Sequence, residues 1–72
     1  MGIQIVMDHT GDSRFEVDIA DAKSLEAAEA RFDRLLAEGY TAAIKTPAGP
    51  ILTRKFDSAA QETLFYPRLV GG

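Results

Sequence analysis

The first predicted strand lies near the N-terminus, where apolar residues alternate along the chain. Ile3, Ile5 and Met7 fall on one face of an extended segment, and Gln4 falls on the other. Val6 is also apolar, although it shares the second face with Gln4. The strand is therefore expected to be partly covered on both sides and to lie in the centre of a sheet.

A second strand is predicted after a turn. The turn covers residues 9–13, where Gly11 can adopt a positive φ and the polar side chains can bond to the local backbone. Apolar and charged residues then alternate from residue 14 to residue 19. The apolar side chains expected to point inward are Phe15, Val17 and Ile19. The two strands together predict a hairpin.

A helix from residue 22 to residue 38 is predicted by the spacing of its apolar residues. They recur three or four positions apart and form one stripe: Leu25, Ala28, Phe32, Leu35 and Leu36. Asp21 or Ser24 can cap the N-terminus by accepting from free backbone N–H groups. Gly39 suits the position after the last helical residue, where a left-handed conformation is common.

The second half of the chain contains a second predicted hairpin and a last strand. Strands over residues 40–45 and 51–56 flank a rigid turn at residues 46–50, which is bounded by two prolines. A short helical turn over residues 57–62 leads to a last strand at residues 63–66.

The return strand of this second hairpin is predicted to lie at an edge of the sheet. Its alternation is poor, because Leu52 and Phe56 are expected to point inward together with Arg54. An edge strand with a charged, exposed side is disfavoured as a template for aggregation. Asp57, which follows it, can cap the short helical turn.

The order of these elements predicts an α+β domain of the type ββαββ(β), in which a mixed sheet packs on one long helix. Residues 1–72 are expected to form a single small domain. The most buried side chains are expected to be those on the inward faces: Ile5, Phe15, Val17, Leu25, Phe32, Leu36 and Ile44.

Composition argues against several kinds of function. The net charge is −3 and the basic residues are dispersed, whereas a nucleic-acid binder usually has a basic stripe. There is no cysteine and only one histidine, so neither a metal site nor a cofactor is expected. The sequence contains no recognisable signal peptide and no apolar run of the ~20 residues that a membrane span needs. We therefore expect a cytoplasmic protein that binds neither nucleic acid nor membrane.

No catalytic arrangement is expected, and the protein is predicted not to be an enzyme. His9 lies in a turn beside Thr10 and Asp12, but neighbouring residues of a short turn cannot hold a rigid nucleophile and base. Gly11 and Gly49 are isolated, whereas a phosphate-binding loop needs several glycines before a helix.

The end of the sequence, residues 68–72, is expected to form a flexible tail. Gly71 and Gly72 have no side chains, so an extended tail can thread a narrow channel and place its carboxylate in an enzyme's active site. A carboxylate delivered in this way can be adenylated and then attacked by a nucleophile. The candidate site is therefore the Gly72 carboxylate together with the tail positions that a partner would recognise: Arg68, Leu69, Val70 and Gly71.

Residues 62–72 resemble the C-terminal signature of the β-grasp sulfur carriers, and most of all the small subunit of molybdopterin synthase. In that signature an acidic residue, an apolar and aromatic strand, a proline and a terminal Gly-Gly follow in this order, as Glu62 and Pro67 do here. The thiamine-pathway sulfur carrier and ubiquitin share the Gly-Gly ending. The chain departs from the family in lacking an Asp-Gly-Asp stretch before the last strand and in having Arg68 in place of a second proline.

The resemblance implies a ubiquitin-like β-grasp fold, in which the first and last strands pair in parallel at the centre of the sheet. It also implies a partner, an E1-like adenylating enzyme, that activates the carboxylate of Gly72. The activated carboxylate then becomes a thiocarboxylate that donates sulfur, or is conjugated to a lysine. The alternative is a non-catalytic protein-interaction domain with a disordered Gly-Gly end. In either case a monomer or a weak dimer is expected.

Overall fold

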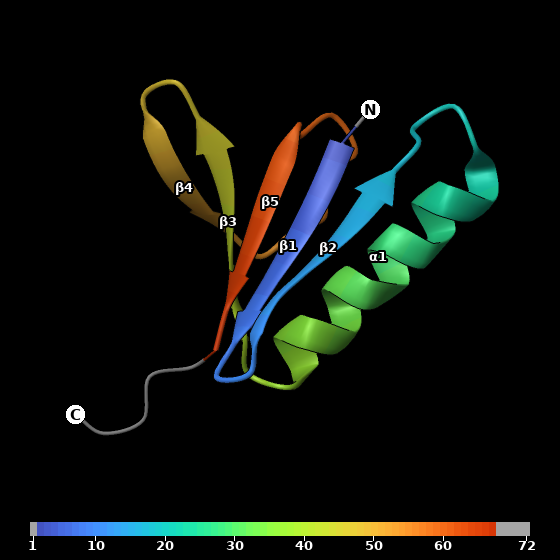
Figure 1. Ribbon diagram of the computed structural model, residues 1–72. Coiled ribbons are helices and arrows are strands. Elements are labelled where there is room, and N and C mark those ends of the chain that lie inside the picture. The colour runs from blue at the N-terminus through green and yellow to red at the C-terminus, as the bar shows by residue number, and fades with distance from the viewer. Residues whose placement is uncertain (1, 68–72) are drawn as a thin grey trace.

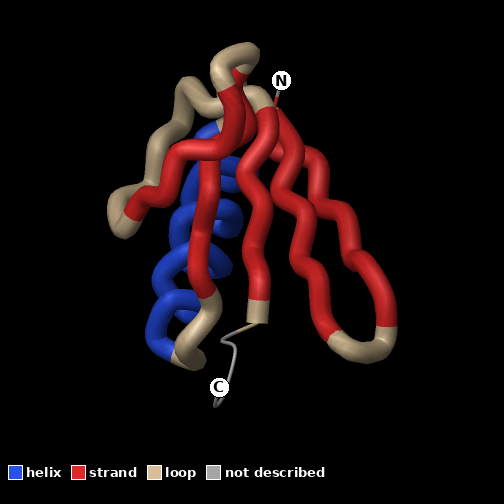
Figure 2. The backbone as a smooth tube through the Cα atoms, turned by 90° about the vertical axis from the view of Figure 1, so that its left-hand side faces the viewer, coloured by secondary structure: helices blue, strands red, loops and turns tan. Residues whose placement is uncertain are grey.

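The computed structural model describes residues 2–67, which form a five-stranded sheet and one helix (Figure 1). The elements in chain order are β1 (Gly2–Asp8), β2 (Gly11–Val17), α1 (Ala22–Ala37), β3 (Thr41–Thr46), β4 (Gly49–Thr53) and β5 (Glu62–Tyr66). The helix lies on one face of the sheet, and in Figure 2 it is seen behind the strands. The predicted α+β class, with one helix on a mixed sheet, is confirmed.

The first and last strands lie side by side in the sheet. The strand order is β2-β1-β5-β3-β4. β1 pairs in parallel with β5, and the other three pairings are antiparallel. The expected parallel pairing of the first and last strands is therefore confirmed, as is the internal position of the first strand.

The helix begins and ends close to the predicted residues. The Asp21 carboxylate caps its N-terminus by accepting from the Lys23 N–H at 3.1 Å. The hydroxyl of Ser24, the other candidate cap, instead accepts from the backbone N–H of Asp18 at 2.9 Å. Gly39 follows the C-cap with a φ of 99°, a conformation that glycine adopts without steric cost.

The core lies between the helix and the middle of the sheet. Five buried side chains form it: Val6, Phe32, Leu35, Ala42 and Phe65. The ring of Phe32 meets the rings of Phe65 and Phe56 edge to face, with centroids 5.7 Å and 5.9 Å away. Phe32 thus joins the helix to β5 and to the segment after β4.

One polar side chain, Gln4, is buried between the sheet and the helix. Its amide donates to the carbonyl of Ala28 at 3.1 Å, and its oxygen accepts from Arg31 at 2.6 Å. The guanidinium of Arg31 in turn lies 4.0 Å from the centroid of the Phe15 ring. Burial lowers the pKa of Arg31 below its usual value. The cluster links β1, β2 and α1 and leaves the buried amide of Gln4 with hydrogen-bond partners.

The face assignment of β1 is corrected by this packing. Gln4 bonds to the helix and Val6 belongs to the core, so these two residues face α1. Side chains alternate along a strand, so Ile3, Ile5 and Met7 lie on the helix-free face. Ile5 is buried as expected, at 6% exposure, although it lies on the face opposite to the helix.

The first hairpin has a shorter turn than predicted. Its loop is His9 and Thr10, and pairing resumes at once between Asp8 and Gly11. β2 therefore ends at Val17 rather than residue 19. Ile19, expected to point inward, lies beyond the strand and is 50% exposed.

The segment after β4 also differs from the prediction. β4 ends at Thr53, and Phe56 reaches the core from outside the strand. No helix forms at residues 57–62. The Asp57 carboxylate accepts from the Ala59 N–H at 2.9 Å and its carbonyl accepts from the Ala60 N–H at 3.2 Å, which makes a turn.

Three of the seven side chains expected to be most buried are buried: Ile5, Val17 and Phe32. The other four are half-buried: Phe15, Leu25, Leu36 and Ile44. One helix is too narrow to cover five strands, so inward positions near its margins keep some contact with water. Within the described residues, no helix combines the length and apolar content needed to cross a membrane.

Candidate functional site

The site predicted from the sequence lies outside the described residues. It consists of the Gly72 carboxylate and the four tail positions Arg68, Leu69, Val70 and Gly71. The structure does place the point where this segment begins, because β5 ends at Tyr66 and Pro67 follows. Proline has no backbone N–H and cannot extend the ladder of β5 in full.

The exit of the C-terminal segment lies at one end of the sheet, on an internal strand. Tyr66 pairs with Thr41 at the start of β3. On its other side β5 runs parallel to β1, so the end of β1 and the turn at His9 and Thr10 lie at the same end of the sheet (Figure 1). The exit is thus flanked by one hairpin turn and by the connection from α1 to β3.

The helix-free face of the sheet carries a row of apolar residues beside this exit. Ile5 lies opposite Leu64 on β5, which lies opposite Ala43 on β3, which lies opposite Leu52 on β4. We call this row and its apolar neighbours the apolar open face: Ile3, Ile5, Met7, Ala43, Leu52, Leu64 and Tyr66.

Exposure is uneven along the row and is highest at its β4 edge. Ala43 is 1% exposed and Leu52 is 71% exposed. Charged residues border the row: Arg14 faces Ile5 from β2, and Lys45 pairs with Glu62 at 3.5 Å. An apolar strip with a polar rim is typical of protein-binding surfaces.

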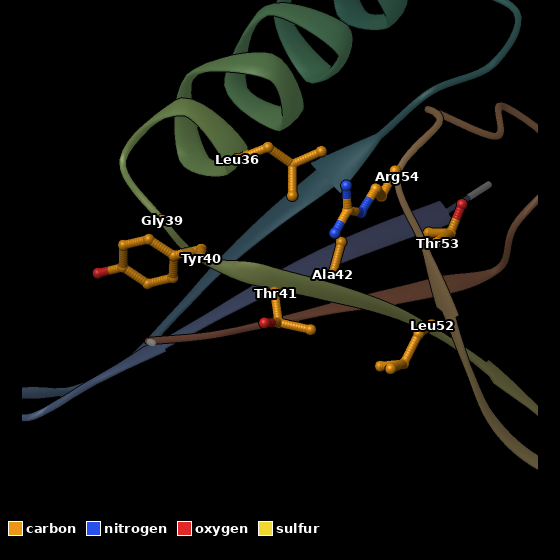
Figure 3. Close-up of a pocket in the computed structure, with 8 residues that line it drawn as sticks. All are labelled: Leu36, Gly39, Tyr40, Thr41, Ala42, Leu52, Thr53 and Arg54. Atoms are coloured by element: carbon orange, nitrogen blue, oxygen red, sulfur yellow. The ribbon is translucent and has the colours of Figure 1, made fainter. Parts of the chain in front are cut away.

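An open cleft lies beside the exit, between the end of α1, the start of β3 and the end of β4 (Figure 3). Leu36 from α1 and Arg54 from the segment after β4 point toward Ala42, whereas the ring of Tyr40 points outward. Thr41, the pairing partner of the last β5 residue, also lines the cleft. Among the described residues, the lining contains no carboxylate, histidine or cysteine, and its one charged side chain is Arg54.

The turn that contains the single histidine is held by a local network. The Asp8 carboxylate accepts from both the N–H and the hydroxyl of Thr10. The hydroxyl hydrogen bond, followed by the backbone one, lowers the pKa of Asp8 below its ordinary value of 3.8. His9 itself is exposed. Asp8 and Thr10 thus stabilise the turn that contains His9.

No cluster of His, Cys, Asp and Glu that could hold a metal ion occurs between residues 2 and 67. Within the same range, every buried side-chain nitrogen and oxygen has a hydrogen-bond partner. We define the candidate site by the strand exit, the apolar open face and the adjoining cleft.

Sequence reasoning missed the apolar open face because it placed Ile5 on an inward face, which Ile3 and Met7 share. Val6 gives β1 a second apolar face, and this pattern led to the expectation that both faces are partly covered. A strand with two apolar faces in a sheet with one helix must leave one of them without helix cover.

Comparisons with known proteins leave the site to be interpreted from its chemistry: no family model, no curated protein and no solved structure matches this chain.

Proposed function

We propose that this protein is a small ubiquitin-like carrier or modifier of the β-grasp type, whose carboxylate at Gly72 is activated by an E1-like adenylating enzyme. The observation that carries the proposal is the place of β5. β5 is an internal strand that runs parallel to β1. It ends at Tyr66, at the same end of the sheet as the turn between β1 and β2, and Pro67 follows it. This strand order agrees with what the resemblance of residues 62–72 implies.

The position of the exit supports delivery of a carboxylate. A partner enzyme that binds the apolar open face would hold the body of the protein next to the start of the tail. Extended chain spans at most ~3.3–3.6 Å per residue, so residues 68–72 can reach ~17 Å from Pro67. The two glycines would occupy the narrow part of the enzyme's channel, where any side chain would add bulk.

The chemistry needs only the main-chain carboxylate of the carrier. A Gly72 carboxylate oxygen attacks the α-phosphorus of ATP, the bond to the β-phosphate breaks, and pyrophosphate leaves. A nucleophile then attacks the acyl carbon and AMP leaves. A persulfide of a donor enzyme gives an acyl disulfide, from which a second thiol releases the thiocarboxylate by forming a disulfide with the donor. A lysine amine instead gives an isopeptide bond and loses a proton. The proposal requires a free carboxylate at Gly72, whether the chain is made with that end or is cleaved to it.

The direct test is ATP–pyrophosphate exchange with candidate activating enzymes from the same organism. Wild type is expected to support exchange. Removal of Gly71 and Gly72, or Gly71→Val, is expected to abolish it without changing the fold, because these residues follow the last strand. Leu52→Asp is the comparison variant, because it changes the folded domain and leaves the tail intact. It is expected to raise the KM for the carrier, because it places a charge on the apolar open face. Exchange that is the same for wild type and the deletion would refute the proposal.

Intact mass spectrometry of protein from its native cells gives a second, independent readout. A population heavier by the exchange of one oxygen for one sulfur, located at the C-terminus, would indicate a sulfur carrier. A ladder of conjugates would indicate a modifier.

The second candidate function is a non-catalytic protein-interaction domain. The 71% exposure of Leu52 at the edge of the apolar open face favours it, because a partner could extend the contact from Leu52 along the apolar row. This function predicts that Leu52→Asp weakens partner binding while the Gly71-Gly72 deletion has no effect in any assay.

A further inference from the structure

The proposed function does not involve the outer edge of β2, which is the side of the strand that faces away from β1. β2 is the last strand at its side of the sheet and spans seven residues, Gly11–Val17. In a two-residue hairpin the residues flanking the loop form a hydrogen-bonded pair, and such pairs alternate along the ladder. From the pair of Asp8 with Gly11, the backbones of Asp12, Arg14 and Glu16 therefore point away from β1.

The opposite edge of the sheet, on β4, is built differently. The same alternation from the pair of Thr46 with Gly49 makes Pro50 and Leu52 the outward residues. Pro50 has no N–H, so the first outward donor of that edge is missing, and proline on an edge strand is a common device against strand addition. β2 contains no proline and keeps its outward donors and acceptors.

The side chains along the β2 edge alternate in charge. Asp12, Arg14 and Glu16 are exposed on the helix-free face. Within residues 2–67 none of the three belongs to an ion pair. On the helix face, Phe15 is only half-buried, although Arg31 covers its ring. The edge thus offers a pattern of negative, positive and negative charge beside an incompletely covered aromatic ring.

We propose that the β2 edge binds a second copy of this chain as an antiparallel strand, about a two-fold axis at Phe15. In this register Arg14 of each copy lies opposite Glu16 of the other, and each such pair exchanges two backbone hydrogen bonds. The two Phe15 rings become direct cross-strand neighbours on the helix face. The sheets join into one, with both helices on the same face.

The charges select this register over the centred one. With the axis at Arg14, the two Arg14 side chains would face each other and Asp12 would face Glu16, so three like-charge pairs would form. Moving the axis by one residue, to Phe15, replaces these with two opposite-charge pairs within β2 and places Asp12 opposite Asp18, which lies beyond the end of the strand. An isologous interface of this kind closes on itself and does not propagate into a fibre, and it leaves the Pro50 edge outside the contact.

The test is a charge exchange followed by sedimentation velocity over about a hundredfold range of protein concentration. Wild type is expected to pass from monomer to dimer. Arg14→Glu and Glu16→Arg are each expected to weaken dimerisation about tenfold or more, since both symmetric ion pairs become like-charge pairs. The double variant, Arg14→Glu with Glu16→Arg, is expected to restore it. Far-UV circular dichroism confirms that each variant is folded.

Two controls make the result specific. Arg54→Glu changes the net charge as Arg14→Glu does but lies beyond β4, so it is expected to leave the dimer intact. Asp12→Arg is expected not to weaken the dimer. In a register centred on Ser13, Asp12 would be the partner of Arg14, and the same variant would disrupt the dimer. A protein that stays monomeric throughout, single reversals without effect, a double variant that fails to recover, or disruption by Asp12→Arg would each overturn the proposal. None of these outcomes depends on the reactivity of Gly72.

Discussion

Replacement of Phe32 by alanine tests the packing at the centre of the molecule. Phe32 is 1% exposed, and its ring contacts Phe65 on β5 and Phe56 after β4, both edge to face. Truncation of a buried phenylalanine to alanine costs ~3–5 kcal/mol, from lost transfer energy and from the cavity left behind. A chain of 72 residues has a total stability of ~4–11 kcal/mol. Phe32→Ala is therefore expected to remove a large part of the stability, and at the lower end of that range to unfold the protein.

Urea denaturation followed by circular dichroism measures the effect, with Phe32→Leu as a milder variant that keeps the experiment informative. Phe32→Leu conserves most of the volume and is expected to cost ~1 kcal/mol, which lowers Tm by ~4–8 °C in a domain of this size. Asp33→Ala, at the next, exposed position of α1, is the control and is expected to change stability by less than ~0.5 kcal/mol. A Phe32→Ala midpoint close to that of Asp33→Ala would refute the assignment of Phe32 to the core.

Three further predictions follow from local contacts. Gln4→Leu removes the buried acceptor of Arg31 and is expected to lower the free energy of unfolding by ~1–3 kcal/mol, measured by urea denaturation. Adding Arg31→Met to this variant should lower it little further, because the two side chains act together. The pKa of Asp8 is expected below 3.8 in a carboxyl NMR titration, because a threonine hydroxyl in the same turn donates to its carboxylate. Its contribution to stability is then present above pH 3.8 and lost as the pH falls through the lower folded-state pKa; a pKa at or above 3.8 would contradict the hydrogen bond. Gly2→Ala would place a Cβ 2.9 Å from the carbonyl oxygen of Ala60 and is expected to destabilise the protein by ~1–3 kcal/mol; an unchanged thermal midpoint would show that this close approach is not required.

Much of the secondary structure could be predicted from the sequence because it depends on neighbours along the chain. The period of the apolar stripe, the carboxylate of Asp21 and the conformational freedom of Gly39 define the helix within one or two residues. The alternation from Arg14 to Val17 likewise places Phe15 and Val17 on the helix side of β2. These are local effects, and the structure confirms them.

The candidate site could be predicted only in part. The tail residues were named from their own chemistry, from glycine's lack of a side chain and from a resemblance in the last eleven positions. The apolar open face could not be assigned from the sequence, because an apolar residue in a strand has the same appearance whether it faces the helix or the opposite side of the sheet. Ile5 and Val6 are both buried, at 6% and 8% exposure, yet they lie on opposite faces of the sheet.

The sequence by itself determined where this chain forms a helix, where it turns and which strands alternate, since those properties arise from backbone preferences and periodicity over a few residues. Only the tertiary structure decided which face of β1 meets α1, because that choice depends on Gln4 finding the Ala28 carbonyl and Arg31 across the layer. It also decided that Leu52 stays exposed and that the β2 edge stays open. Each of these outcomes depends on how many strands a single helix can cover and on which strands are internal, and contacts between residues far apart in the sequence determine both.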